Sequence, residues 1–252
     1  MTACIAPKAG IREFLKRADS KTRLEDYKRG LCFWATLDEP SIASIVFAEN
    51  SGYPILELVE FVNQIQNRRC EVEFVSVDME APPDGLSYGY SEFMLIEHAL
   101  LHSEKLSKCT HFIKATGRYI FPKISRLIRK LPNEFQIAAD CRGARPWAKD
   151  TSPMILTTAL VIFERRFYLR EIASLYRTMV PAPPWDRRQF IEAILFDTLV
   201  TSRDVDGVIL RWPCNCDPVG FGANGDKLNS INRLVKYKIR AVLRLLWPSL
   251  WF

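Results

Sequence analysis

The chain has 252 residues, of which 48% are hydrophobic, 25% charged and 12% aromatic. These fractions are typical of a folded globular protein and exclude disordered, collagen-like and low-complexity classes. No run of about 18 uncharged apolar residues occurs, so the sequence predicts no membrane-spanning helix, and charge appears too early for a signal peptide. The seven cysteines are scattered; their spacing favours free thiols in a reducing, cytoplasmic compartment.

Strand-like and helix-like segments alternate through the first half of the chain. Buried or alternating apolar runs predict strands at 2–6, 43–48, 71–77, 110–114 and 135–139. Helical periodicity and start signals predict helices from a cap at Ser20 to residue 37, and at 54–65, 91–103 and 123–131. Strands separated by helices in this way predict a mostly parallel α/β sheet.

The second half is less regular. An apolar, β-rich segment is expected at 154–163, helices at 168–178 and 186–201, and a last strand at 206–212. The glycine-rich segment 216–226 lacks the Gly-Lys-Ser/Thr of a phosphate-binding P-loop, and no dinucleotide-binding, metalloprotease or nucleophile-elbow motif occurs. His98 and His102 are four residues apart on one predicted helix but lack a third metal ligand.

Polar residues follow several of the predicted strands. In open α/β sheets, ligands bind outside the carboxyl ends of the strands. This rule points to Pro7, Glu49, Asn50, Asp78, the turn 114–118 and Asp140. Lys114 and Arg118 flank a glycine turn, where a point charge and a planar guanidinium are both suited to a phosphate, although a solvated turn fits the spacing equally well.

Three short segments resemble a group of bacterial glycosyltransferases of the GT-A type, which act in lipopolysaccharide and capsule assembly. They are Glu-Asn-Ser-Gly at 49–52, Tyr-Gly-Tyr-Ser-Glu at 88–92, and Phe-Ile-Lys-Ala-Thr-Gly-Arg-Tyr at 112–119. The group typically has an acidic-Asn-Ser motif, a G-Y-G-E loop and a K-x-T-G-R-Y turn, and the last is the most specific. The similarity covers residues 2–145 and continues more faintly beyond them.

The sequence departs from the group's pattern in two places. Ser91 stands where the group usually has glycine, and the fourth strand does not end in the Asp-x-Asp that many GT-A enzymes use to hold a divalent metal. The resemblance therefore implies that cationic side chains, rather than Mg²⁺ or Mn²⁺, stabilise the departing phosphate. Asp78, Asp84 and Asp140 are left as possible metal ligands.

The resemblance also implies roles for individual residues. Glu192 is expected to be the base for the acceptor hydroxyl, with Glu92 and Asp140 as rivals, and a solvent-facing helix position is the alternative for Glu192. The residues expected to bind the nucleotide-sugar donor are Pro7, Glu49, Asn50, Asp78, Lys114, Gly117, Arg118 and Tyr119.

The net charge of +6 comes from the C-terminal tail, because residues 227–252 hold six basic and no acidic side chains. Apolar residues recur there at spacings of three and four, which predicts an amphipathic helix lying on an anionic membrane surface. The side chains expected to contact the membrane are Arg233, Lys236, Arg240, Arg244, Trp247 and Trp251. A terminal helix packed on the domain is the alternative, and nucleic acid is not an expected partner.

Together these patterns predict an α/β, GT-A-like catalytic domain at 1–226, with a Rossmann-like, mostly parallel sheet, and a basic membrane-associating helix at 227–252. The expected activity is transfer of a sugar from a nucleotide-activated donor to a lipopolysaccharide or capsule acceptor, glycan or lipid-linked, at the cytoplasmic face of the membrane. Two alternatives remain: a non-catalytic membrane-associated scaffold of the same fold, and a sugar nucleotidyltransferase.

Overall fold

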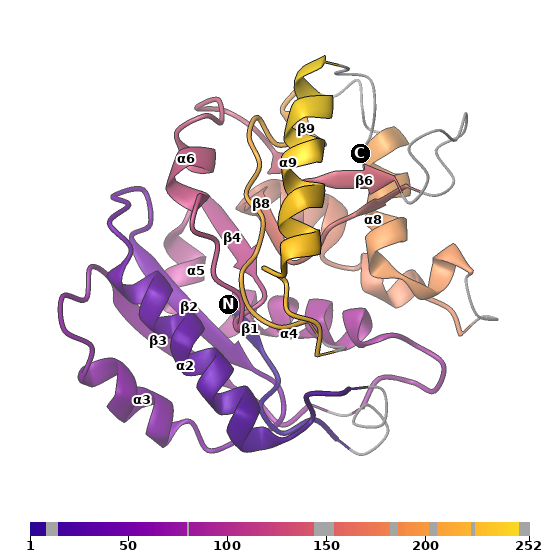
Figure 1. Ribbon diagram of the computed structural model, residues 1–252. Helices are drawn as coiled ribbons and strands as arrows, with labels where there is room; N and C mark the ends of the chain where they lie inside the picture. Colours follow the sequence, from indigo (N-terminus) through magenta and orange to yellow (C-terminus); the bar gives the residue numbers. More distant parts are fainter. Residues whose placement is uncertain are drawn as a thin grey trace.

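The structure is a computed structural model, and it describes residues 1–8, 15–79, 81–143, 154–181, 186–201, 206–222 and 225–246. Its strands form an α/β arrangement with helices on both sides (Figure 1). A parallel sheet has the order β1-β2-β3, and its strands are β1 (Thr2–Ala3), β2 (Ser44–Glu49) and β3 (Glu71–Ser76). A mixed sheet has the order β4-β8-β5-β9, and its strands are β4 (His111–Ala115), β8 (Leu160–Glu164), β5 (Ile137–Ala138) and β9 (Val208–Ile209).

The two sheets meet between β1 and the carboxyl end of β4, where a parallel bridge pairs Thr2 with Thr116. The strand order across this junction is β3-β2-β1-β4-β8-β5-β9. From β1 the chain moves outward through β2 and β3, then returns to the other side of β1 to form β4. This is a topological switch point, the place where open α/β sheets form a ligand crevice.

The mixed sheet differs from the mostly parallel sheet expected from the sequence, because β8 runs antiparallel to both β4 and β5. The segment 154–163 is not one strand: a turn at residues 158–159 separates β8 from β7 (Met154–Leu156), which pairs with β6 (Cys141–Gly143). Because β8 is reversed, its amino end lies at the same sheet edge as the carboxyl end of β4. The turn before β8 therefore reaches the switch point.

The helices follow the expected order but differ in detail. Asp19, rather than Ser20, caps the first long helix: its carboxylate accepts a hydrogen bond from the backbone N–H of Thr22 at 2.7 Å. The predicted helix 168–178 is a π-helical turn followed by a 3₁₀ turn. The helical segments are α2 (Ser20–Thr36), α3 (Leu56–Asn63), α4 (Tyr88–His102), α5 (Glu104–Lys108), α6 (Ile124–Ile128), α7 (Arg165–Phe167), η1 (Tyr168–Ile172), η2 (Leu175–Thr178), η3 (Arg187–Gln189), α8 (Ile191–Thr201) and α9 (Ile231–Leu246).

The mixed sheet separates two hydrophobic cores, because alternate side chains of a strand point to opposite faces. On β8, Val161 and Phe163 join the core under α4 and α8, whereas Leu160 and Ile162 join the core under α2 and α6. Burial on both faces fixes the register of β8 and therefore the position of the turn before it.

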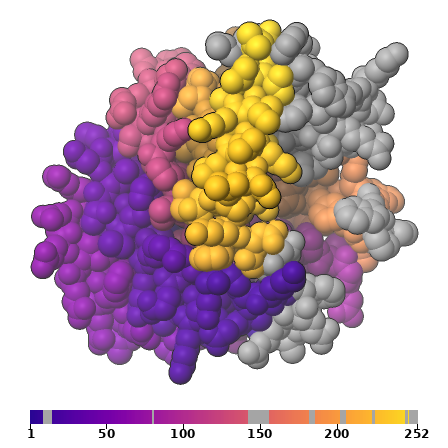
Figure 2. All heavy atoms as spheres, in the orientation of Figure 1, coloured from indigo at the N-terminus to yellow at the C-terminus, as the bar shows by residue number. Residues whose placement is uncertain are grey.

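The last helix, α9, lies on the outside of the molecule, where it crosses the surface as a raised ridge (Figure 2). No helix in the described part of the chain is both long and apolar enough to cross a membrane.

Candidate functional site

A crevice of about 330 Å³ opens at the switch point between β1 and β4. Its size falls in the usual range for small-molecule sites, about 300–1,000 Å³. The walls come from the end of β1, from α2, α4 and α8, from the turn after β4, and from the turn before β8. Residues distant in sequence therefore converge where the fold predicts a ligand.

Arg118 is the central cation of this crevice. It is only 7% exposed, and its Nε and Nη1 atoms are buried without a hydrogen-bond partner among the described residues. No carboxylate among the described residues forms an ion pair with it, and its guanidinium lies 5.4 Å from the ring centroid of Tyr119. A buried charge without a counter-ion is unfavourable unless a ligand supplies one. Arg118 is therefore the candidate anion-binding residue of this crevice.

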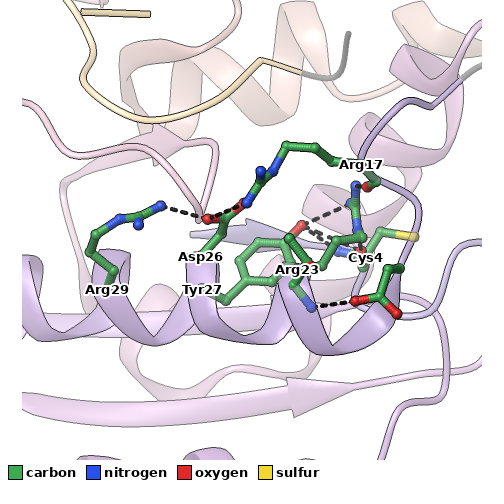
Figure 3. Close-up of polar contacts among 8 residues, drawn as sticks. Cys4, Arg17, Arg23, Asp26, Tyr27 and Arg29 are labelled. Atoms are coloured by element: carbon green, nitrogen blue, oxygen red, sulfur yellow. Dashed lines mark hydrogen bonds and ion pairs between the residues drawn. The ribbon is translucent and has the colours of Figure 1, made fainter. Parts of the chain in front are cut away.

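Arg23, from α2, is a second buried cation in the wall (Figure 3). Its Nε donates to the carbonyl oxygen of Cys4 at 2.7 Å, its Nη1 to that of Arg17 at 3.2 Å, and its Nη2 to the hydroxyl of Tyr27 at 3.2 Å. Burial raises the pKa of Tyr27, so this phenol is neutral. All three acceptors of Arg23 are uncharged, and its positive charge adds to that of Arg118.

Asp26, three residues after Arg23 on α2, forms its ion pairs with residues other than Arg23. Asp26 is buried, and its carboxylate binds Arg17 at 2.9 Å and Arg29 at 2.6 Å. Figure 3 shows Arg17 and Arg29 on either side of Asp26, with Arg23 outside this ion-pair cluster. The direct ion pairs of Asp26 are thus made with Arg17 and Arg29 and not with the crevice arginines.

Two carboxylates face the same crevice. Glu92, from α4, accepts a hydrogen bond from the hydroxyl of Thr2 at 2.7 Å and pairs with Lys114 at 2.8 Å. Glu192, from α8, accepts one from the hydroxyl of Thr158 at 3.1 Å. Desolvation, together with the charge of Glu92, raises the pKa of Glu192 above the ordinary value. A carboxylate with a raised pKa is suited to accept a proton near neutral pH.

Further polar atoms line the crevice without partners. The side-chain oxygens of Asn50 and Ser91 are buried and form no hydrogen bond with any residue that the structure describes. Tyr88 stands beside them with its ring 57% exposed. Buried polar atoms are usually paired, so these positions favour a polar ligand.

Lys114 does not reach the crevice wall. Its side chain is 1% exposed, and its ammonium group binds Glu92 and the carbonyl oxygen of Thr158. Lys114 thus pairs with Glu92 from outside the crevice lining. Of the predicted Lys–Arg pair, Arg118 is the residue that lines the crevice.

The polar residues Glu49, at the end of β2, and Asp78, after β3, have partners within the protein. Glu49 is fully buried and accepts hydrogen bonds from the backbone N–H groups of Ile5 (3.0 Å), Ser51 (3.0 Å) and Tyr53 (3.2 Å). Asp78 forms a 3.0 Å ion pair with Lys8 and is largely exposed. Neither lines the crevice, and neither does Pro7, which is buried.

Gly117 and Asp140 also lie outside the lining. A Cβ on Gly117 would be 2.9 Å from the carbonyl oxygen of Thr2 and 3.1 Å from the ring of Tyr27, so this glycine allows the turn to pack against β1 and α2. Asp140 is 1% exposed. Asp84 is exposed, and among the described residues no group of three or more His, Cys, Asp or Glu side chains is placed to hold a metal ion.

The crevice thus gathers five of the predicted site residues: Asn50, Glu92, Arg118, Tyr119 and Glu192. Sequence reasoning missed Arg23, Tyr27 and the turn before β8. For α2 the available signal was Arg23. It precedes Tyr27 by four residues, so it lies on the helix face that was assigned to the core. The turn before β8 had no such signal, because its position depends on the antiparallel insertion of that strand.

Comparison of the chain with protein-family models and with curated proteins finds no match.

Proposed function

We propose that the protein is a glycosyltransferase of GT-A-like architecture that binds a nucleotide-activated sugar in the crevice between β1 and β4. The observation that carries this proposal is Arg118, a buried guanidinium with two unpartnered nitrogens at the switch point of the sheet. A diphosphate is an anion that matches such a planar donor.

The surrounding residues support a division of roles. Arg118, together with Arg23 in the wall of the same crevice, would stabilise the charge that develops on the departing diphosphate. Asn50 offers an unpartnered amide oxygen to the nucleoside, and the exposed ring of Tyr88 offers a stacking surface to a base or sugar.

Glu192 would act as the base in an inverting transfer. The acceptor hydroxyl oxygen would bond to the anomeric carbon as the bond from that carbon to the diphosphate breaks, and Glu192 would take the hydroxyl proton. Its raised pKa fits this role. The acceptor class, a lipopolysaccharide or capsule glycan, rests on the resemblance of segments 49–52, 88–92 and 112–119.

The first experiment is a thermal-shift panel of UDP, GDP, dTDP, CDP and CMP, each measured with EDTA and with Mn²⁺. A ligand at a hundred times its dissociation constant adds about 2.7 kcal/mol of stability. We expect one nucleotide to stabilise the protein equally in EDTA. The Arg118→Gln variant should lose this shift, and Arg29→Gln, which removes a guanidinium outside the crevice, should keep it.

The second experiment measures donor turnover as release of free nucleotide. Glu192→Gln should lower turnover by about 10²–10⁴-fold while preserving the nucleotide shift, because a general base contributes that much. If the stabilisation by nucleotide required Mn²⁺, a metal ion and not Arg118 would be the group that neutralises the diphosphate. Consumption of a nucleoside triphosphate would indicate a nucleotidyltransferase, and no response to any nucleotide would favour the scaffold.

A further inference from the structure

The outward face of α9 exposes large apolar side chains. They recur at spacings of three and four and so form one stripe along the helix. Between 46% and 77% of each is exposed, and they are Ile231, Leu234, Val235, Ile239, Val242 and Leu246. A surface helix normally buries such a stripe against the body of the protein. Here the stripe is left open to the surroundings.

The opposite, polar face attaches α9 to the body. Arg240 pairs with Asp217 at 3.5 Å, and Arg233 pairs with Asp226 at 3.4 Å. The side-chain amide of Asn215 donates to the backbone carbonyl of Tyr237 at 3.0 Å. The helix is therefore held with its apolar stripe outward, which is the reverse of a terminal helix packed on the domain.

This orientation changes which cations are available to a membrane. Arg233 and Arg240 hold the helix on the body, whereas Lys236 is exposed. Trp247, Trp251 and the side chain of Arg244, all predicted membrane contacts, lie outside the described residues.

A basic groove runs beside the stripe, between α6 and α9. Lys123, Arg126 and Lys130 line it from the α6 side and Lys238 from α9, and the groove encloses about 810 Å³. None of these four cations forms an ion pair with a described residue. No acidic residue occurs in 119–131 or in 227–246. The one carboxylate that lines the groove among the described residues, Asp217, pairs with Arg240, so the groove keeps a positive excess along the edge of an exposed apolar surface.

We propose that α9 and the α6–α9 groove form a docking surface for an anionic phospholipid bilayer. The apolar stripe would enter the boundary between headgroups and acyl chains, and the groove would hold lipid phosphates at the level of the headgroups. The choice of lipid rests on charge complementarity: apolar side chains flanked by unpaired cations match an anionic bilayer surface. This surface does not depend on the transfer chemistry of the crevice.

Vesicle flotation of the full chain tests the proposal. Vesicles of phosphatidylcholine alone are compared with an equimolar mixture of phosphatidylcholine and phosphatidylglycerol. We expect the protein to float only with the mixture. The Val235→Ser/Ile239→Ser variant should abolish flotation, and both sites are about half exposed, so the fold should tolerate the change.

The groove is tested with Lys123→Gln/Arg126→Gln/Lys130→Gln. Since each cation near an anionic surface contributes about fivefold in partitioning, we expect a loss of more than about tenfold. The matched control is Lys21→Gln/Arg68→Gln/Arg166→Gln, which removes three exposed cations from other parts of the surface. It should bind nearly as well as the unchanged protein.

Three outcomes would overturn the proposal. If the groove variant and the control variant lost the same amount of vesicle binding, the binding would depend on net charge and not on the groove. A dimer that dissociates in the serine variant, with no vesicle binding, would make the stripe an interface between copies of the chain. Binding to an oligonucleotide in place of vesicles would assign the groove to nucleic acid. The nucleotide thermal shift should persist in every variant, so failure here is distinguishable from failure of the crevice proposal.

Discussion

Two parts of one sheet edge use their polar side chains in opposite ways. At the end of β2, the carboxylate of Glu49 accepts hydrogen bonds from three backbone N–H groups and is fully buried. At the β1/β4 junction, Arg118 is almost as deeply buried, yet two of its nitrogens have no partner. The first region uses its hydrogen-bonding capacity to stabilise the fold, and the second leaves part of that capacity unused by the described residues.

The contrast shows that position at a strand end does not by itself define a binding residue. What distinguishes the two regions is whether the hydrogen-bonding capacity of a buried group is used within the protein. Five variants can break or sharpen this comparison, each measured by urea unfolding.

We expect the largest effect from Glu49→Ala. It would leave the N–H groups of Ile5, Ser51 and Tyr53 without their acceptor, and each unsatisfied buried group costs about 1–3 kcal/mol. The free energy of unfolding should fall by about 4 kcal/mol. The control is Glu57→Ala, which removes an exposed carboxylate paired with Lys28 and should change stability by less than about 1 kcal/mol. A similar loss in both variants would show that Glu49 is not a structural clamp.

The next effect separates the two cations of the turn. Lys114→Met would leave Glu92, whose side chain is 17% exposed, without its partner, and should cost about 3 kcal/mol. Arg118→Met breaks no ion pair with a described residue, so the unliganded protein should lose less than about 1 kcal/mol, clearly less than Lys114→Met. A loss from Arg118→Met as large as that from Lys114→Met would mean that Arg118 already has a structural counterpart in the protein.

Much of this arrangement could be predicted from the sequence. The strands β2, β3 and β4 were found within a residue or two, because their apolar runs are long and bounded by turn residues. The rule that ligands bind outside the carboxyl ends of strands then identified Asn50 and Arg118 as candidate site residues. The orientation of β8 could not be predicted, since a buried strand has the same apolar pattern in either direction.

The sequence also does not show whether a buried polar group finds its hydrogen-bond partners within the protein. Glu49 and Glu192 are both glutamates beside apolar runs, and nothing local distinguishes the carboxylate that accepts three backbone N–H groups from the one in a crevice. The partner of Glu49 at Ile5 is 44 residues away, and that of Lys114 at Glu92 lies on another element. Such pairings depend on tertiary structure, which periodicity does not report.

A smaller effect is expected at Gly117, where the turn contacts β1 and α2. Gly117→Ala would place a Cβ 2.9 Å from the carbonyl oxygen of Thr2, and neither the strand nor the Tyr27 ring has room to move freely. We expect a loss of about 2 kcal/mol, in the range for overpacking. The control is Gly222→Ala, whose Cβ would meet its nearest atoms at 3.7 Å and should be nearly neutral. Equal stability of the two variants would show that the junction tolerates a shift.

The smallest effect concerns the pH dependence contributed by Glu192. Its pKa in the folded protein is raised by desolvation and by Glu92, so the folded state holds this proton to a higher pH than the unfolded chain, whose glutamates have a pKa of about 4.3. Between these two values the folded state binds more protons, and the contribution of Glu192 to stability falls as pH rises. Glu192→Gln removes this term, so the variant should lose less stability than the unchanged protein as pH increases from 4.3 through the folded pKa. Above that pH the difference should be constant. Urea unfolding of both proteins across this range measures it, and a gap that widens in the opposite direction would show that the charged form of Glu192 is the one the crevice favours.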